Sequence, residues 1–302
     1  MRKCRRKLES KKFVDKAITA MLNENKQLNI GPVPGKPVFG YIDPSTITNQ
    51  EKRRALEAVN LIKKKRCGKI KGRTCADGSK QKRFLKHGES ISSPTVSLEA
   101  IVGTLLIDDH EDRDMAIFDV PGAYLQAEMP KEKKLLMKFR DEFVNIMCEV
   151  NPNCRKYMIK ENGKEVLYVK IPRAIYGCIE SALLWYELYV KTLKGMGFTL
   201  NPYDKCVANK VINGRQCTVA WYVDDNKLSQ VQPEVVIEVL EVIKTHFREL
   251  EISRGDEHNL LGIKIVTDRE NRSVIISMRD QIDESIKMFG EDVDDTVASR
   301  MS

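Results

Sequence analysis

The hydrophobic positions of this chain recur with two periods, which together predict a mixture of helices and strands. In some stretches apolar residues repeat every three or four positions, and elsewhere short apolar runs end at turn residues. Helices are expected over residues 11–28, 45–65, 97–107, 179–196 and 234–246, with a last one beginning near residue 281. The proline-rich stretch 31–43 is expected to be a linker.

Strands are expected where short apolar runs are bounded by Gly, Pro, Asn or Asp. Within residues 67–87 the pattern indicates two short basic strands around a turn at 76–79. Asn213-Gly214 is a strong hairpin signal between two later runs. The other expected strands cover residues 115–118, 134–139, 167–171, 206–212, 216–223, 260–266 and 273–278.

Two adjacent carboxylates, Asp224 and Asp225, end the apolar run 219–223. Asp and Asn tolerate positive φ, so Asp225-Asn226 is expected to form a tight hairpin turn that holds both carboxylates at the rim of a sheet. A buried carboxylate is costly unless its charge is compensated, and Lys227 alone is a weak partner. Clustered Asp oxygens suit a hard divalent cation such as Mg²⁺.

The same pair also has an ordinary interpretation, because Asp-Asp pairs are common and usually solvated. Two others, at 108–109 and 294–295, lie in polar surroundings, and only the pair at 224–225 follows a strand-like run. A second apolar strand ends at Asp119, although a lone Asp in that place is usually a turn former. From these residues alone, a metal site and solvated carboxylates both stay open.

Composition indicates an intracellular globular protein. The chain has 302 residues, 31% of them charged and 42% hydrophobic, which is enough for one large domain or two to three subdomains. The eight cysteines form no C-x-x-C pair, and none of the four His has zinc-ligand spacing from a Cys, so we expect reduced thiols. No signal peptide is visible, and the longest apolar stretch is too short to span a bilayer.

The charge is divided unevenly along the chain. Residues 1–90 carry 24 Lys and Arg against 8 Asp and Glu, whereas the remainder carries 27 against 35. This asymmetry suggests a phosphate-facing surface joined to a carboxylate-rich domain. For the basic strands within 67–87, contact with phosphates and simple solvation both stay open.

Four ordered motifs resemble those of one family. The Tyr222-Val223-Asp224-Asp225 segment resembles the Y-x-D-D box of reverse transcriptases, and residues 118–125 resemble their first carboxylate motif. Residues 170–178 with Trp185 resemble the S-L-Y-G-L-K-Q-A-P-R-x-W segment of copia-type LTR retrotransposons, although residues 179–182 depart from its K-Q-A-P. Residues 261–265 resemble that family's L-G-I-E-[IV] segment. The resemblance extends over residues 60–290.

This resemblance implies an α+β fold of the right-hand polymerase type, with basic fingers, a ferredoxin-like palm and a partial thumb. The expected organisation is an N-terminal helix and linker over 1–44, fingers over 45–112, a palm over 113–266 and the start of a truncated thumb over 267–302. A fingers insertion is expected at about 126–172, within the palm.

The resemblance also implies an RNA-directed DNA polymerase that adds dNTPs to a primer 3′ end with two Mg²⁺ or Mn²⁺ ions. Asp119 and Asp224 would be the principal metal ligands, Asp225 the third carboxylate, and the Val120 carbonyl could complete a coordination shell. Tyr124 would be the gate that excludes a ribose 2′-OH. The remaining implied contacts are Lys71, Arg73 and Gly177 with the dNTP, and Tyr222, Val223, Leu261 and Gly262 with template and primer.

The implied partners are an RNA or DNA template with its primer, dNTPs, and RNase H and integrase segments of a longer Pol precursor, with no membrane. Its location would be intracellular, in a cytoplasmic virus-like particle or the nucleus. The alternative is a catalytically inactive remnant that binds nucleic acid through its basic fingers. Intact Asp119, Asp224, Asp225 and Tyr124 favour the enzyme, whereas the truncated thumb favours the remnant. A different palm polymerase is disfavoured by Tyr124 and by the copia-like helix.

Overall fold

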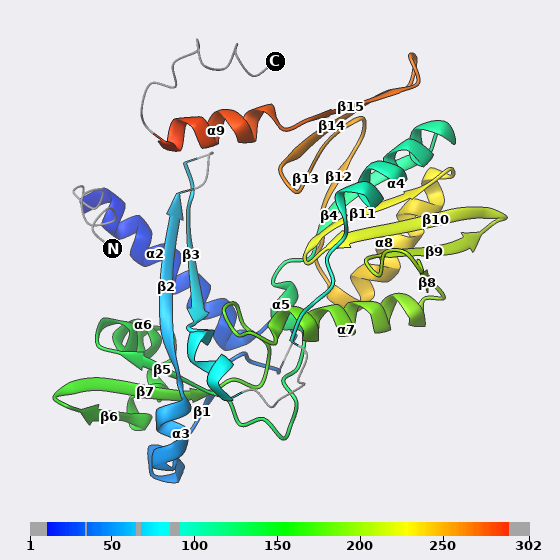
Figure 1. Cartoon of the computed structure of the whole chain (residues 1–302). Coiled ribbons are helices and arrows are strands. Elements are labelled where there is room, and N and C mark those ends of the chain that lie inside the picture. The colour runs from blue at the N-terminus through cyan, green and yellow to red at the C-terminus, as the bar shows by residue number, and fades with distance from the viewer. Residues whose placement is uncertain (1–10, 34, 65–67, 85–90, 290–302) are drawn as a thin grey trace. The chain divides into compact units, whose positions relative to one another are not determined.

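The computed structural model describes residues 11–33, 35–64, 68–84 and 91–289 of a mixed α/β chain (Figure 1). Contacts divide it into two compact units, which we describe separately. Unit 1 combines Met1–Ser93 with Gly122–Tyr189, and unit 2 combines Pro94–Pro121 with Val190–Ser302. The expected fingers, palm and thumb are a different division, based on family resemblance, and their boundaries stay a prediction.

Unit 1 is built on a six-stranded sheet in the order β1-β7-β5-β2-β3, with β6 paired to β7. Its core includes Leu56, Met137 and Val169, together with Phe39 and Phe139, whose rings pack edge to face 5.5 Å apart. Its helices and strands are α2 (Lys11–Ile30), β1 (Gly40–Tyr41), α3 (Asn49–Arg54), β2 (Leu56–Lys64), β3 (Ile70–Ala76), α5 (Ala123–Gln126), β5 (Leu136–Arg140), α6 (Glu142–Val150), β6 (Met158–Glu161), β7 (Lys164–Lys170) and the first part of α7 (Ser181–Gly195).

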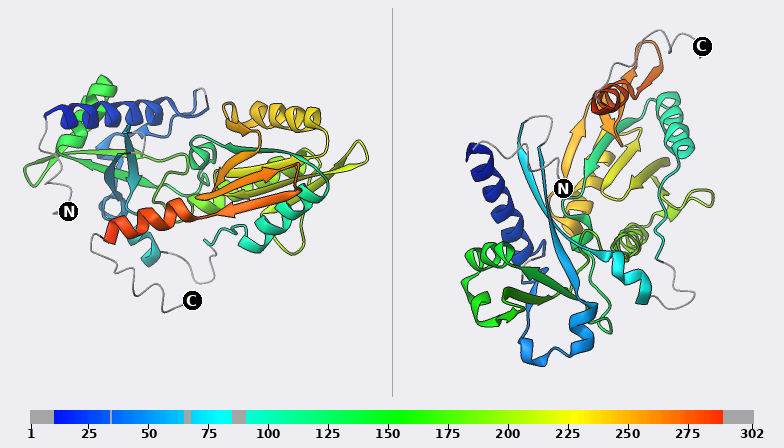
Figure 2. Two further views of the ribbon diagram at one scale, coloured as in Figure 1. Left: turned by 90° about the horizontal axis from the view of Figure 1, so that it is seen from above. Right: turned by 60° about the vertical axis from the view of Figure 1, so that its left-hand side comes forward.

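Helix α2 lies along the β2–β3 hairpin, as the right-hand view in Figure 2 shows. It buries Ala17, Met21 and Leu28, which helical spacing places on one face. A Cβ atom at Gly72 of β3 would lie only 2.7 Å from the Met21 sulfur. The absence of a side chain at Gly72 therefore lets the helix approach the strand closely.

The expected helix over residues 45–65 is wrong. Helix α3 begins after a capping box between Thr48 and Glu51 and ends at Arg54. Ala55 is extended (ψ 136°), and the chain continues as β2, which pairs with β3 and β5. Strand pairing thus overrides an apolar spacing that also suits a helix. The basic hairpin is accordingly β2–β3, and Gly78–Phe84 forms a 3₁₀ helix rather than a second strand.

Unit 2 holds a six-stranded sheet in the order β12-β4-β11-β10-β9-β8 and a three-stranded sheet β13-β14-β15. The predicted helix 234–246 and the Asn213-Gly214 hairpin are confirmed. Besides the last part of α7, unit 2 contains α4 (Leu98–His110), β4 (Asp114–Asp119), β8 (Thr199–Leu200), β9 (Val207–Ile212), β10 (Arg215–Tyr222), β11 (Asp225–Gln230), α8 (Pro233–Phe247), β12 (Glu251–Arg254), β13 (Glu257–Leu260), β14 (Ile263–Asp268), β15 (Ser273–Ser277) and α9 (Arg279–Phe289).

The two faces of β11 contact different helices. Ser229 donates a hydrogen bond to Asp108 of α4, and Lys227 forms an ion pair with the same carboxylate. Since side chains alternate along a strand, Asn226 and Leu228 point to the opposite face. Helix α8 packs against β11 and β4, so that face is also buried. Both faces of the central strand are therefore shielded from water.

One cysteine prediction is wrong. Cys148 of α6 and Cys154 are joined by a disulfide, with their Cα atoms 5.5 Å apart, because a 3₁₀ turn over Pro152–Tyr157 returns the chain to the helix. Because Cys154 follows Cys148 by six positions, the search for C-x-x-C pairs did not indicate this disulfide. Free thiols are found at Cys75, Cys178, Cys206 and Cys217, while Cys4 and Cys67 lie outside the described residues.

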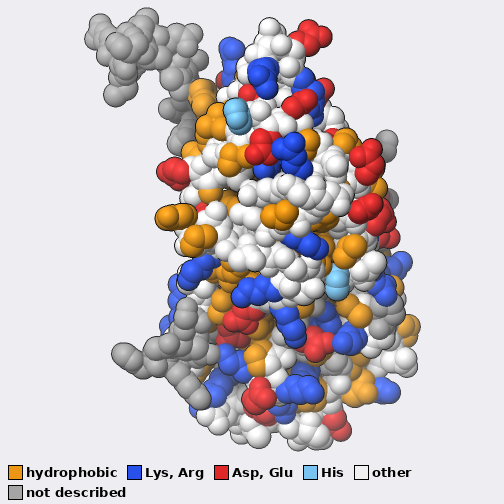
Figure 3. Space-filling model, turned by 90° about the vertical axis from the view of Figure 1, so that its right-hand side faces the viewer, with side chains coloured by type: hydrophobic (Ala, Val, Ile, Leu, Met, Phe, Trp, Pro, Cys, Tyr) orange, Lys and Arg blue, Asp and Glu red, His pale blue; other side chains and the backbone are white. Residues whose placement is uncertain are grey.

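The surface in Figure 3 carries both signs of charge, with Lys and Arg side chains interspersed among Asp and Glu. No described helix combines the length and the apolar character needed to cross a membrane.

Candidate active site

The β10–β11 hairpin places the predicted carboxylates at its tip. Tyr222 pairs with Asp225, so the two-residue turn is Val223-Asp224. The expected turn at Asp225-Asn226 is wrong, because both residues belong to β11. Val223 has a φ of 58°, which is rare for a β-branched residue and indicates local strain at the tip.

Strand register brings the three predicted carboxylate positions together. Asp225 is the direct partner of Asp119 across β11 and β4, and opposite residues in such a pair have Cβ atoms about 4.5–5.5 Å apart. The Asp224 carbonyl accepts a hydrogen bond of 3.1 Å from the Val120 amide. On the other side of β4, Asp119 pairs with Glu251 of β12, a further carboxylate that no motif indicated.

The two adjacent carboxylates of the hairpin, Asp224 and Asp225, influence each other's charge. Burial raises the pKa of Asp225, and the charge of Asp224 raises it further. Among the described residues, no ion pair joins Asp224 or Asp225 to a Lys or Arg. Lys227, considered as a weak partner, pairs instead with Asp108 of α4. The Asp224-Asp225 pair therefore concentrates negative charge that no ion pair among the described residues balances.

The kind of donor at this tip fits a divalent cation, since carboxylate oxygens are the ligands that Mg²⁺ and Mn²⁺ prefer. However, among the described residues no three His, Cys, Asp or Glu side chains are gathered closely enough to hold a metal. Strand register makes the ends of β4 and β11 adjacent without assembling such a three-residue group. The metal roles of Asp119, Asp224 and Asp225, and of the buried Val120, stay predictions.

Unit 1 brings three of the predicted dNTP-binding residues together. The ring of Tyr124 packs against Tyr176, with centroids 5.0 Å apart, and the Arg73 guanidinium lies 4.1 Å from the centroid of the Tyr176 ring. Gly177 follows with a φ of 90°, where a Cβ atom would lie 2.0 Å from the Ala76 carbonyl oxygen. This close approach requires glycine and joins β3 to the Tyr176 loop.

The fourth residue of that set, Lys71, lies two positions before Arg73 and shares its face of β3. Lys71 is paired with Lys63 and Arg73 with Leu61 across the hairpin. This face therefore combines the exposed cations Lys63 and Lys71 with the half-buried Arg73 and the exposed Leu61.

The predicted template and primer residues lie on two turns of unit 2. Tyr222 is 40% exposed beside Asp225, and Val223 follows in the turn of the same hairpin. Leu261 and Gly262 both have positive φ and form the turn between β13 and β14, so the expected strand 260–266 is interrupted there.

Two residues outside the predicted set contact predicted ones. Tyr176 lies between Tyr124 and Arg73, and it belongs to the segment that carries the copia-type resemblance. Asn226 donates hydrogen bonds from its side chain to the carbonyls of Asp224 and Phe118. Because Asn226 follows two Asp residues, the sequence suggested a turn at this position, and its contacts within the strand were not predicted.

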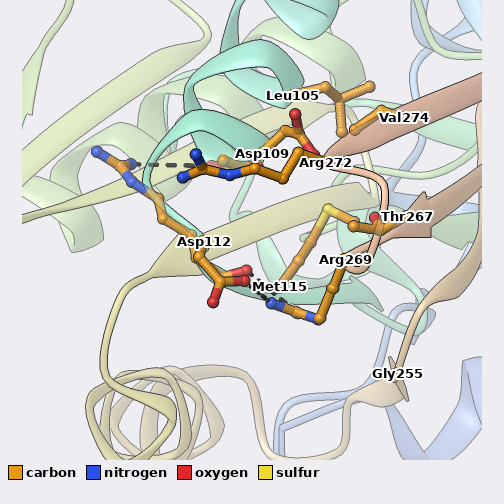
Figure 4. Close-up of a pocket in the computed structure, with 11 residues that line it drawn as sticks. Leu105, Asp109, Asp112, Met115, Gly255, Thr267, Arg269, Arg272 and Val274 are labelled. Carbon is orange, nitrogen blue, oxygen red and sulfur yellow. Dashed lines mark hydrogen bonds and ion pairs between the residues drawn. The ribbon is translucent and has the colours of Figure 1, made fainter.

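A cavity of about 90 Å³ in unit 2 lies away from this tip (Figure 4). It includes Arg113 and Met115 near the start of β4, about 16 Å along the strand from its carboxylate end. Arg269, which also lines it, forms ion pairs with Asp112 and Asp256. Because these charges are matched within the protein, we treat the cavity as structural.

Comparison with known proteins identifies the family. Residues 46–299 match the family model described as "Reverse transcriptase (RNA-dependent DNA polymerase)". Since this match covers well over half of the chain, the protein belongs to that reverse transcriptase family, which confirms the predicted resemblance.

A curated relative is the retrovirus-related Pol polyprotein from transposon TNT 1-94 of Nicotiana tabacum, 22% identical over 222 residues. The match covers 73% of this chain and 15% of the relative, so the chain corresponds to a small part of that polyprotein. This relative supports the assignment to a reverse transcriptase domain of a copia-type Pol polyprotein.

Two solved structures are distant matches. Apo telomerase from Candida tropicalis, truncated from its C-terminal domain, is 10% identical with a TM-score of 0.41, covering 86% of this chain and 60% of that one. Telomerase from Candida albicans, in complex with the TWJ fragment of telomeric RNA, is 9% identical with a TM-score of 0.38, covering 80% and 49%. At TM-scores below 0.5 they carry no argument here.

Proposed function

We propose that this chain is an RNA-directed DNA polymerase domain that adds dNTPs to a primer 3′ end on an RNA or DNA template. The observation that supports this most directly is the register pairing of Asp119 with Asp225, within the span that matches the family. Two adjacent strand ends with carboxylates are the arrangement that metal-assisted phosphoryl transfer requires.

The carboxylates Asp119, Asp224 and Asp225 would hold two Mg²⁺ or Mn²⁺ ions, with the Val120 carbonyl as a further oxygen donor. Bound there, the ions would activate the primer hydroxyl and stabilise charge on the triphosphate. The chain itself supplies the placement, because the β4–β11 pairing holds two of the carboxylates on neighbouring strands. The unbalanced negative charge at the tip supplies the electrostatic attraction for cations.

Selection of dNTPs is assigned to unit 1. The Tyr124 ring would exclude a ribose 2′-OH, and the Tyr176 ring beside it would hold it in place. Lys71 and Arg73 would contact the triphosphate, and Gly177 would let the backbone approach the incoming base pair. The packing of Arg73 over Tyr176 supports a common role for these residues.

Template and primer would contact Tyr222, Val223, Leu261 and Gly262, all of which lie in or beside tight turns of unit 2. By analogy with its polyprotein relative, the domain would act within a longer Pol precursor that also carries RNase H and integrase segments. That precursor would work inside the cell, in a virus-like particle or in the nucleus.

The test measures dTTP incorporation on poly(rA)–oligo(dT) with Mg²⁺. We expect the unmodified chain to incorporate dTTP, and Asp224→Asn to lower the rate by about 10²–10³-fold or more, because a ligand charge is lost. Asp109→Asn, in the Asp108-Asp109 pair, is the matched control and should leave the rate unchanged.

Absence of incorporation by the unmodified chain contradicts the proposed activity. If that chain still binds the template–primer with a steep salt dependence, the inactive nucleic-acid-binding remnant becomes the better description. Equal incorporation by Asp224→Asn and the unmodified chain contradicts the metal assignment alone.

A further inference from the structure

Asn226 is a fully buried polar residue beside the carboxylates. Its side chain is 0% exposed and lies on the α8 face of β11, where its cross-strand partners are Trp221 and Phe118. A strand position with two large aromatic neighbours and a helix above it is normally occupied by an apolar residue.

The side-chain amide joins two strand ends. Its Nδ2 donates to the Asp224 carbonyl at 2.5 Å and to the Phe118 carbonyl at 3.3 Å. Phe118 precedes Asp119, so the two accepting carbonyls belong to the segments that carry the facing carboxylates. The Asp224 carbonyl also accepts from the Val120 amide, which closes the connection between the β10–β11 turn and the end of β4.

Stability alone does not favour Asn226. Its Oδ1 atom is buried and has no hydrogen-bond partner among the described residues. Leaving such an acceptor unpaired is unfavourable, whereas an apolar side chain of similar shape would avoid the cost. The Asp224 carbonyl would keep its bond from the Val120 amide if Asn226 were replaced. The residue therefore imposes a local cost while holding the tip in one geometry.

We propose that Asn226 is a positioning residue that holds the turn bearing Asp224 against the strand end bearing Asp119. This inference rests on the proposed polymerase function and assigns a role that the motif comparison does not contain. The side-chain amide acts from the α8 face of β11, while the side chains of Asp225 and its partner Asp119 lie on the opposite face. By holding both backbones, it sets the separation from which the carboxyl groups converge on a cation.

The test uses Asn226→Leu, with Asn226→Met as a second variant in case leucine does not fit. We expect the variant to melt at the same temperature or higher, because the unpaired acceptor is removed. The kcat for dTTP incorporation should fall about tenfold or more, with the KM for dTTP within about twofold. The Mg²⁺ concentration for half-maximal rate should rise. A purely structural role predicts a lower melting temperature and unchanged kinetics.

Gln230→Leu is the matched control. Gln230 is also 0% exposed, lies on the same face at the other end of β11, and donates from its side-chain amide to the Ile212 carbonyl. We expect this variant to keep the parental kcat and Mg²⁺ dependence. An equal loss of kcat in both variants, or a kcat for Asn226→Leu within twofold of the parent, overturns the proposal.

Amide hydrogen exchange separates this inference from the proposed function. Residues 118–121 and 222–226 should exchange faster in Asn226→Leu than in the parent and in Gln230→Leu. If the parent incorporates no dTTP, the polymerase proposal fails, and the exchange rates still decide whether Asn226 joins the two segments. Unchanged exchange in both segments overturns the positioning role.

Discussion

Two Asp-Asp pairs of this chain look alike in sequence and have opposite surroundings in the fold. Asp108 is only 6% exposed, and its carboxylate contacts Lys227, accepts a 2.6 Å hydrogen bond from Ser229 and lies 3.9 Å from the Arg113 guanidinium. At the β10–β11 tip, by contrast, no ion pair among the described residues joins Asp224 or Asp225 to a Lys or Arg. The third pair, Asp294-Asp295, lies outside the described residues.

Compensation of charge is what separates the two pairs. A carboxylate already matched within the protein has little to gain from a cation in solution, and its network holds α4 to the sheet. At the tip, burial raises the pKa of Asp225 and the charge of Asp224 raises it further, and a bound divalent ion would offset both effects. Burial lowers the pKa of Lys227, and the attraction of Asp108 partly opposes this shift.

The largest expected effect comes from breaking the compensated pair. Lys227→Met leaves Asp108 buried without its main partner, so we expect a loss of about 3–5 kcal/mol in the free energy of unfolding, measured by urea titration. The double variant Lys227→Met with Asp108→Leu should recover most of that loss. A single variant as stable as the parent would show that the pair does not support the fold.

A smaller effect is expected from the hydroxyl in the same network. Ser229→Ala removes a hydrogen bond to a buried charge, so we expect a loss of about 1.5–3 kcal/mol in the same urea titration. Ser253→Ala is the control, at an exposed position of β12 where the hydroxyl makes only a long contact of 3.4 Å with His258 Nδ1, and it should stay within about 0.5 kcal/mol of the parent. If both variants were equally stable, the hydrogen bond from Ser229 to Asp108 would contribute no more to stability than an exposed serine hydroxyl does.

The smallest expected effect concerns the Asp224-Asp225 pair at the β10–β11 tip. The folded-state pKa of Asp225 lies above its ordinary value of 3.8, so the folded protein keeps this proton up to a higher pH than the unfolded chain does. Stability should therefore fall as the pH rises from 3.8 through the raised pKa, and the penalty is complete above it. Asp225→Asn lacks this penalty, so at neutral pH we expect a melting temperature higher by about 1–2 °C.

Thermal scans from acid to neutral pH, with and without Mg²⁺, measure this difference. Below pH 3.8 the two proteins should melt together. Mg²⁺ should raise the melting temperature of the parent more than that of Asp225→Asn, since only the parent has the full set of carboxylates to balance. Equal responses to Mg²⁺ would mean that the tip does not bind the ion.

Local signals predicted much of the fold. The helical spacing of α2, α4 and α8 and the Asn213-Gly214 turn all depend on residues close together in the chain. The segment after Arg54 was mispredicted because its apolar spacing suits either a helix or a strand, and only pairing with β3 and β5 decides between them.

For the candidate site, the sequence by itself determined the family and the carboxylates at the strand ends, because both are carried by short contiguous motifs. Only the tertiary structure decided that Asp225 faces Asp119, that Lys227 serves Asp108 and that Asn226 joins the two strand ends. These contacts link residues more than a hundred positions apart. They depend on the register of β11 against β4 and on the packing of α4, which no local pattern specifies.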